Sequence, residues 1–272
     1  MFLKKLLSIS LLFILITIIS CSSGKYGATN KEYKQQAKSF AKVLRQYPLK
    51  DSFDNAPAFV GTINFGMRKP NFVIIHHTAQ NSCEQTLQTF TLKRTQVSAH
   101  YVICREGTIY HMMNDYLRAW HAGAGTWGND ADVNSSSIGI ELDNNGFEPF
   151  SEAQINSLLT LLQHLKKAYN IPQANFIGHA DIAPTRKNDP NVHFPWKKLS
   201  ERGFGLWYND TSKISVPQNF NNLSALRIIG YNIKDSAAAI RAFKRHFEEQ
   251  DSSNTINEGD RKILYDISRK NE

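Results

Sequence analysis

The residues of this 272-residue chain that could do chemistry follow directly after apolar segments. His76 and His77 come after one such run, and His179 comes after another, with Asp189 ten positions further on. Two histidines and one carboxylate are the protein ligands of many catalytic zinc ions, whose fourth position stays open for water or substrate. The spacing alone does not distinguish such a centre from hydrogen-bonded structural histidines, because nine histidines are scattered over the chain.

Only one of the two adjacent histidines can face such a site. The run before them, residues 72–75, is apolar at every position, which is typical of a strand buried on both faces. Successive side chains of a strand point to opposite faces. The pattern therefore predicts one ligand and one histidine packed on the other side, without choosing between His76 and His77.

Strand and helix patterns alternate along the middle of the chain. Strand patterns occupy residues 71–77, 100–113 (two strands joined by a turn at residues 105–107), 136–146 and 175–180. Helical patterns occupy residues 31–46, 83–95 and a segment that begins at Ser151, where Gln154 completes a capping box. The alternation predicts an α/β domain with a mixed central sheet flanked by helices. Sites in such sheets lie at the carboxyl ends of strands, where His179 and a further carboxylate, Glu141, also lie.

The N-terminus has the features of an export signal. Residues 1–20 contain two lysines followed by an apolar core, the order of regions in a secretory signal peptide. The core ends in Ile18-Ile19-Ser20-Cys21, which resembles the lipobox of bacterial lipoproteins, where the cysteine is acylated. We expect Cys21 to anchor the protein to a membrane, the outer membrane facing the periplasm. A plain signal peptide or an N-terminal membrane helix is the alternative.

The remaining chain divides into three parts by composition. Residues 21–55 are expected to form a tether and an N-terminal helix, residues 56–208 the catalytic domain, and residues 209–272 a small helical module that follows a polar, turn-rich stretch. Beyond Cys21 the chain has two cysteines, Cys83 and Cys104. A disulfide and two buried thiols both fit them.

The charge balance indicates an anionic partner. The chain has 32 Lys and Arg against 24 Asp and Glu, and removal of the two lysines in residues 1–20 leaves an excess of about six. This balance suits a cell-wall glycopeptide. Nucleic acid is not expected, because basic and aromatic residues do not interleave in any stripe and the protein is expected to be exported.

Six motifs occur in one order: IIHHTA, SAHYVICREGTIY, WHAG, SIGIELDN, GHADIAPTRKNDP and FPWKKLSERGFGLW. Together, over residues 70–208, they resemble the zinc-dependent N-acetylmuramoyl-L-alanine amidase family (amidase 2, T7-lysozyme-like), and within it the lipoprotein amidases of the bacterial outer membrane. The end of the chain is similar to the C-terminal peptidoglycan-binding module of those enzymes. The resemblance implies hydrolysis of the amide bond between N-acetylmuramic acid and L-alanine in peptidoglycan or muropeptides.

The resemblance also implies Zn²⁺ as the cofactor and assigns five residues: three ligands, His76, His179 and Asp189, and two catalytic residues, Glu141 and Lys187. It thereby chooses His76 over His77, which is expected to pack or hydrogen-bond beneath the site. One departure concerns Asn191, where family members often have glycine. Asparagine tolerates the left-handed backbone that glycine supplies, so the turn is expected to be kept.

The sequence leaves the substrate contacts and one alternative function open. His100, Trp120 and His121 lie in matched motifs and are expected to line the cleft, although core packing at strand ends explains them equally well. Arg186 either meets a substrate carboxylate or is solvated. The alternative function is a peptidoglycan-recognition protein of the same fold that binds muropeptides without cutting them. The sequence does not decide between anhydro and intact muramyl substrates, or the oligomeric state.

Overall fold

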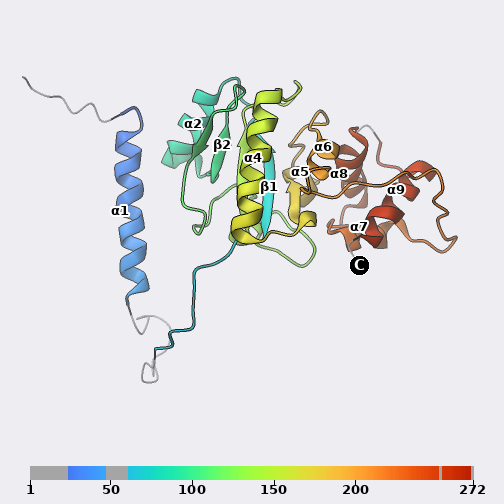
Figure 1. Cartoon of the computed structure of the whole chain (residues 1–272), viewed down its shortest axis with the longest axis horizontal. Coiled ribbons are helices and arrows are strands. Elements are labelled where there is room, and N and C mark those ends of the chain that lie inside the picture. Colours follow the sequence, from blue (N-terminus) through green and yellow to red (C-terminus); the bar gives the residue numbers. More distant parts are fainter. Residues whose placement is uncertain (1–23, 47–60, 251–252, 271–272) are drawn as a thin grey trace, which may run out of the picture. The chain divides into compact units, whose positions relative to one another are not determined.

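A computed structural model describes residues 24–46, 61–250 and 253–270 of the chain (Figure 1). The chain divides into two compact units, Met1–Ile63 and Asn64–Glu272, which are described separately. The predicted signal peptide, residues 1–20, and the predicted acylation site, Cys21, lie outside the described residues. Export and lipid attachment therefore stay predictions.

The described part of the first unit is dominated by one helix, α1 (Gly27–Leu44), which covers most of the predicted helix at residues 31–46. None of its residues is buried. Phe40, Val43 and Leu44 are exposed on it. Within the described part of the chain, no helix is both long enough and apolar enough to cross a membrane.

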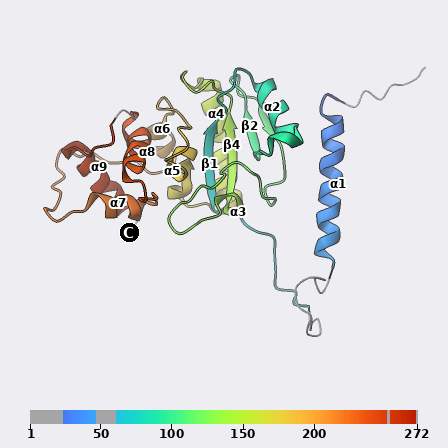
Figure 2. The same ribbon diagram turned by 180° about the vertical axis from the view of Figure 1, so that it is seen from behind.

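A five-stranded mixed sheet lies in the second unit, in the order β3-β2-β4-β1-β5. Figure 2 shows β2, β4 and β1 side by side. The strands are β1 (Phe72–His77), β2 (Tyr101–Ile103), β3 (Ile109–His111), β4 (Ser137–Leu142) and β5 (Phe176–Gly178). Strands β2, β4, β1 and β5 run parallel, and β3 pairs antiparallel with β2 to form the predicted hairpin. The mixed sheet with flanking helices confirms the predicted α/β class.

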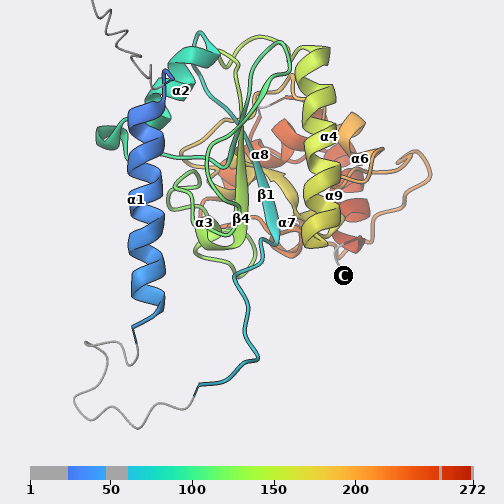
Figure 3. The ribbon, with the colours of Figure 1, turned by 60° about the vertical axis from the view of Figure 1, so that its left-hand side comes forward.

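Helices cover both faces of the sheet. Helix α4 (Glu152–Tyr169) lies in front of β1 in Figure 1 and behind it in Figure 2, and Figure 3 shows it alongside the sheet. Its leucines pack on the strand side chains of one face, Val73 and Ile75 among them. The opposite face carries Ile74 and packs against the short helices α3 (Val133–Ser136) and α5 (His179–Ile182). The polar residues of the site lie on this second face, which α4 does not cover.

The start of α4 differs in one respect from the predicted capping box. The Ser151 hydroxyl accepts a hydrogen bond from the Gln154 amide, as expected for an N-cap. The Gln154 side chain does not return to Ser151. It donates instead to the carbonyl oxygens of Ile103, at 2.8 Å, and Asp143, at 3.1 Å. The residue therefore ties the helix to the ends of β2 and β4, because their carbonyl groups lie within its reach.

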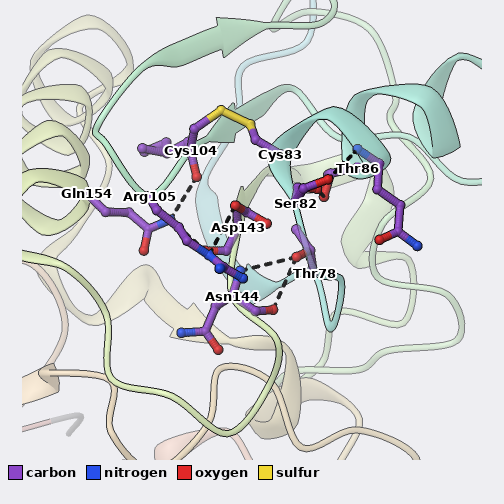
Figure 4. Close-up of a disulfide and its surroundings, with 11 residues drawn as sticks. Thr78, Ser82, Cys83, Thr86, Cys104, Arg105, Asp143, Asn144 and Gln154 are labelled. Atoms are coloured by element: carbon purple, nitrogen blue, oxygen red, sulfur yellow. Dashed lines mark hydrogen bonds and ion pairs between the residues drawn. A yellow bond between two sulfur atoms is a disulfide. The ribbon is translucent and has the colours of Figure 1, made fainter.

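A disulfide joins Cys83 and Cys104 (Figure 4). Cys83 is the first residue of α2 (Cys83–Thr91), and Cys104 follows β2 directly. The predicted helix at residues 83–95 ends early, at Thr91, and a 3₁₀ turn, η1 (Lys93–Thr95), follows. The disulfide attaches α2, and with it the segment between β1 and α2, to the sheet.

Four helices form the end of the second unit. They are α6 (Trp196–Ser200), α7 (Asn222–Ile229), α8 (Ser236–Glu248) and α9 (Glu258–Arg269). The last three share a core of their own, in which Leu226, Phe243 and Leu264 are fully buried. The C-terminal helices are thus present as predicted, and α8 also contacts α5 and α6. The boundary at residues 208 and 209 stays a prediction.

Candidate metal centre

The sheet register brings His76 and Glu141 to the same side. Strands β1 and β4 are parallel neighbours, and His76 is paired with Glu141 across them. Paired residues of adjacent strands point to the same face of a sheet, since the pleat of both strands is in step. His76 Nδ1 and Glu141 Oε1 are 4.0 Å apart, and both residues are at least nine-tenths buried. The structure therefore places His76, and not His77, at the site.

Three side chains converge beside this pair. His76 Nδ1 lies 2.9 Å from His179 Nδ1 and 3.1 Å from Asp189 Oδ2, and His179 Nδ1 lies 3.0 Å from the same carboxylate oxygen. His179 is the first residue of α5, directly after β5. Asp189 comes from the loop that follows α5. The sequence predicts these three residues as metal ligands, and the structure gathers them into one buried cluster.

The hydrogen bonds of the two Nε2 atoms determine which ring nitrogens of His76 and His179 can bind a metal. His179 Nε2 lies 3.3 Å from the Ala122 carbonyl oxygen, which can only accept, so Nε2 carries the proton and Nδ1 keeps its lone pair. His76 Nε2 lies 3.0 Å from His121 Nδ1, and His121 Nε2 lies 3.1 Å from the Ser137 hydroxyl. That hydroxyl donates to the Val133 carbonyl, so the chain of donors runs from His76 to His121 to Ser137. Both Nδ1 atoms are thus directed into the cluster as acceptors.

The cluster fits a divalent cation in its chemistry and its spacing. Two nitrogen lone pairs and a carboxylate oxygen that face one another at these distances repel unless positive charge lies between them. Zinc bonds to nitrogen and oxygen measure about 2.1 Å, which places neighbouring ligand atoms of a tetrahedron about 3.4 Å apart. The observed separations of 2.9, 3.1 and 3.0 Å are close to that value. In many metal sites, a hydrogen bond to the outer nitrogen fixes the ring of a metal-bound histidine, as His121 and the Ala122 carbonyl do here.

Burial and charge tune the acidity of the cluster. Burial, followed by the nearby charge of His179, lowers the pKa of His76 to about 4, so the ring is neutral near pH 7. Burial alone would raise the pKa of Asp189, but the neighbouring His179 and His76 rings outweigh this effect, and the pKa is lowered. Neutral imidazoles and an ionised carboxylate are the forms that bind metals.

Glu141 has the opposite environment. Burial, reinforced by the negative charge of Asp189, raises the pKa of Glu141 to about 8, and the positive charge of Lys187 opposes this shift. A carboxyl group whose pKa lies near neutrality can both accept and donate a proton, which is what a general acid–base residue needs. Lys187 itself is exposed, two residues before Asp189.

A cleft of about 340 Å³ opens over the cluster. One part of its wall is apolar, with Phe90, Val97 and Trp120, and another is basic, with Arg186 and Lys187. The five residues assigned by the sequence all line this cleft: His76, His179, Asp189, Glu141 and Lys187. The site therefore joins a buried ligand cluster to an open groove.

The three residues predicted to line the cleft have different positions in the structure. Trp120 is 52% exposed and lines the cleft, as expected. His121 also lines it, but its ring nitrogens bond His76 and Ser137, so it supports a ligand. His100 is fully buried: its Nδ1 accepts from the Gly139 amide and its Nε2 donates to the Leu117 carbonyl. His100 is packed in the core because both of its nitrogens serve the backbone, and the expectation that it lines the cleft is wrong.

His77 points to the other face and holds the Asp189 loop from below. Its Nδ1 accepts a hydrogen bond from the Asn191 amide at 3.1 Å, two residues after Asp189. Asn191 does not take the expected left-handed backbone. Its side-chain amide donates to Asn144 Oδ1 and to the Glu148 carbonyl, so side-chain bonds hold the turn instead.

Two supporting residues could not be found from the sequence. Ser137 and the carbonyl of Ala122 orient the histidines, and nothing in their types marks them. Gly139 carries a signal that is legible only once the register is known, because a Cβ atom there would lie 2.4 Å from the His121 ring. The small residue in β4 is what makes room for His121.

A buried cluster of two histidines and one aspartate with a neighbouring glutamate, at the carboxyl edge of a parallel sheet, is the kind of site that metal-dependent hydrolases have. A family model described as N-acetylmuramoyl-L-alanine amidase matches residues 66–192. The chain is 33% identical over 207 residues to the N-acetylmuramoyl-L-alanine amidase AmiD of Escherichia coli. The aligned region covers 64% of this chain and 74% of AmiD. The chain belongs to the N-acetylmuramoyl-L-alanine amidase family.

Other relatives are shorter or known as structures. The 1,6-anhydro-N-acetylmuramyl-L-alanine amidase AmpD of Haemophilus influenzae is 40% identical over 104 residues, which covers 38% of this chain and 56% of AmpD. The structure of E. coli AmiD in complex with anhydro-N-acetylmuramic acid-L-Ala-D-gamma-Glu-L-Lys superposes with a TM-score of 0.67 at 28% identity, covering 77% of this chain and 93% of AmiD. AmpDh3 of Pseudomonas aeruginosa, in complex with anhydromuramic pentapeptide, gives 0.69 at 27% identity, covering 80% and 98%.

Proposed function

We propose that this protein is a zinc-dependent N-acetylmuramoyl-L-alanine amidase that cuts the amide bond between N-acetylmuramic acid and L-alanine in peptidoglycan or muropeptides. The observation that carries the proposal is the convergence of His76 Nδ1, His179 Nδ1 and Asp189 Oδ2 next to Glu141, at the floor of the cleft. The names of AmiD and AmpD support the bond that is cut.

His76, His179 and Asp189 would hold Zn²⁺ through those three atoms. When bound, zinc supplies Lewis-acid chemistry, since it lowers the pKa of water and polarises a carbonyl oxygen. Glu141 accepts a proton from the attacking water and delivers it to the nitrogen of the leaving L-alanine. The pKa of Glu141, raised to about 8 by burial, suits the second of these steps in particular.

Lys187 stabilises the negative charge that develops on the carbonyl oxygen. It lines the cleft two residues from Asp189, and its charge already acts on Glu141. A cation held next to a developing oxyanion lowers the barrier by about 3 kcal/mol in comparable sites. The apolar wall formed by Phe90, Val97 and Trp120 suits the flat face of a sugar ring, and Arg186 suits a carboxylate of the stem peptide.

Two parts of the proposal concern the rest of the protein. We propose that the chain is exported and anchored through an acylated Cys21 to the outer membrane, facing the periplasm, on the support of the lipobox-like sequence before that residue. The C-terminal helices, residues 209–272, are proposed to contact peptidoglycan. Mass spectrometry of the protein from its own membranes tests the first part, because triacylation raises the mass of an N-terminal peptide that begins at Cys21 by three acyl chains and a glyceryl group.

Digestion of purified sacculi tests the activity. Zinc-loaded protein should release peptides with free L-alanine N-termini, and His76→Ala should lose both zinc and activity. Glu141→Gln should keep zinc but lose at least about a hundredfold in kcat, since it removes the proton-transfer group and leaves the ligands. The exposed Glu152→Gln is the matched control and should behave as the wild type. Binding of muropeptides without release by the wild type would instead favour a recognition protein.

A further inference from the structure

The carboxylate of Asp181 connects the ligand-bearing helix α5 to the C-terminal helices. Asp181 lies two residues after His179 and is 2% exposed. Its Oδ2 accepts hydrogen bonds from the Gly178 amide, at 2.8 Å, and from His246 Nδ1, at 2.7 Å. Its Oδ1 accepts one from the Tyr231 hydroxyl, also at 2.7 Å. The bond to Gly178 caps the turn in which His179 is the first residue.

Two of the three donors belong to the C-terminal helices. Tyr231 follows α7, and His246 lies in α8, 50 and 65 residues from Asp181. Both are almost fully buried. The His246 ring stacks on Trp196, at 3.9 Å between centroids and 12° between planes, and Trp196 belongs to the core of the sheet domain. The contact is therefore a buried one, with stacked rings.

The same region holds a second loop of the metal centre. The Gly128 amide donates to the Gly230 carbonyl at 2.8 Å, and Asn232 Nδ2 donates to Thr126 Oγ1 at 3.2 Å. This loop contains Ala122, whose carbonyl oxygen accepts from His179 Nε2. The C-terminal helices thus act on His179 twice, through its backbone and through its ring.

We propose that the C-terminal helices form a structural part of the metal centre, in which Tyr231 and His246 position His179 by fixing Asp181. The inference rests on the proposed zinc site but not on catalysis. All three ligands lie within the family match, yet two buried donors from outside it hold the turn on which one ligand stands. Tyr231 and His246 are positioning residues, since neither contacts the ligand atoms.

Removal of either donor should loosen the turn. Tyr231→Phe leaves Oδ1 of the buried Asp181 carboxylate without its donor, and His246→Phe leaves Oδ2 with the Gly178 amide alone. Lost hydrogen bonds to a buried carboxylate are costly, so the chain around it shifts to find water or another donor. A shift of a few tenths of an ångström is enough to misplace His179 Nδ1. Outer partners of metal ligands are worth about 10- to 100-fold in metal affinity. Because Tyr231 acts one step further out, we expect Zn²⁺ to bind about tenfold more weakly to Tyr231→Phe.

Competition with a chromogenic chelator measures the Zn²⁺ dissociation constant directly, without any hydrolysis. We would compare residues 22–272 of the wild type with Tyr231→Phe and with His246→Phe, which keeps an aromatic ring on Trp196. Tyr265→Phe is the matched control, since it makes the same change in the same group of helices, on α9, where Tyr265 packs against Phe220. Circular dichroism verifies that each variant is folded at the assay temperature.

The outcomes separate the two proposals. Weaker zinc binding by both variants, with Tyr265→Phe unchanged, supports the positioning role. If Tyr231→Phe and His246→Phe lower the unfolding temperature but bind zinc as tightly as the wild type, the two residues only stabilise the fold and the inference is overturned. If the wild type binds no zinc, the proposed function itself fails. Should one variant be unfolded, the other decides, because each removes a different hydrogen bond.

Discussion

The disulfide offers a prediction whose magnitude follows from the chain length that it closes. Cys83 and Cys104 are separated by 21 residues. In the chain-entropy description, a loop of this length loses about 11 cal/mol/K in the unfolded state, which amounts to about 3.3 kcal/mol at 25 °C. We therefore expect the oxidised protein to have a free energy of unfolding about 3 kcal/mol higher than the reduced protein.

Urea unfolding of residues 22–272 measures this difference. Because Cys104 is 2% exposed, the reduced form is best made by unfolding with a phosphine reductant and refolding in its presence. With a slope of about 3 kcal/mol per molar urea, the midpoint of the reduced form should fall by about 1 M. The comparison leaves all side chains in place, so the loss of packing does not contribute.

The double variant Cys83→Ala, Cys104→Ala is the control, and its midpoint should not respond to the reductant. Coincident curves for the oxidised and reduced wild type would refute the reasoning. Such a result would mean that the unfolded reduced chain keeps enough residual structure to hold the two cysteines near each other, so that the disulfide removes little entropy from it.

Three further predictions follow from the site and the C-terminal helices. His121→Phe leaves the His76 Nε2 proton without its acceptor and should weaken Zn²⁺ binding about 10- to 100-fold, measured by chelator competition; unchanged affinity would contradict the donor chain. His77→Phe removes the acceptor of the Asn191 amide and should lower the unfolding temperature while its zinc site stays in place. Burial, with a hydrogen bond to Asp260, raises the pKa of Glu248 from 4.5 to about 7, so the folded state keeps a proton there that the unfolded chain has lost. This stabilisation is complete below pH 4.5 and is lost as the pH rises through 7. The free energy of unfolding of the wild type, minus that of Glu248→Gln, should therefore decrease from pH 5 to pH 8. A difference that does not change with pH would contradict this expectation.

Much of the fold was predictable because its signals are local. The apolar run at residues 72–75 indicates a strand buried on both faces, and residues 136–146 also have a strand pattern; the structure has both strands near the centre of the sheet. The early end of α2 was not predictable from periodicity, since a 3₁₀ turn has nearly the same apolar spacing. The Gln154 side chain does not complete the capping box, because it donates to a carbonyl group of a distant strand. That carbonyl comes within reach only in the folded chain.

The residues of the site, likewise, were predictable only in part. The motif order assigns the three predicted ligands and Glu141, and the structure brings these four residues together, although the motifs cannot give their distances. His100 and His121 look alike in sequence, and only the direction of each ring separates a core residue from a ligand support. Asp181 and Tyr231 are 50 residues apart, so no local pattern connects them. Long-range contacts of this kind depend on the packing of whole helices.

The pairing of His76 with Glu141 across two central strands has a consequence for how this enzyme family can change. Their separation is set by the hydrogen-bonded spacing of neighbouring strands, about 4.8 Å, and not by any loop. The walls of the cleft, by contrast, come from segments outside the strands, such as those that carry Phe90 and Trp120. Substitutions in the segment that carries Phe90 and Val97 can alter which glycopeptide fits without moving the reacting groups, so specificity can be redesigned while the chemistry is conserved.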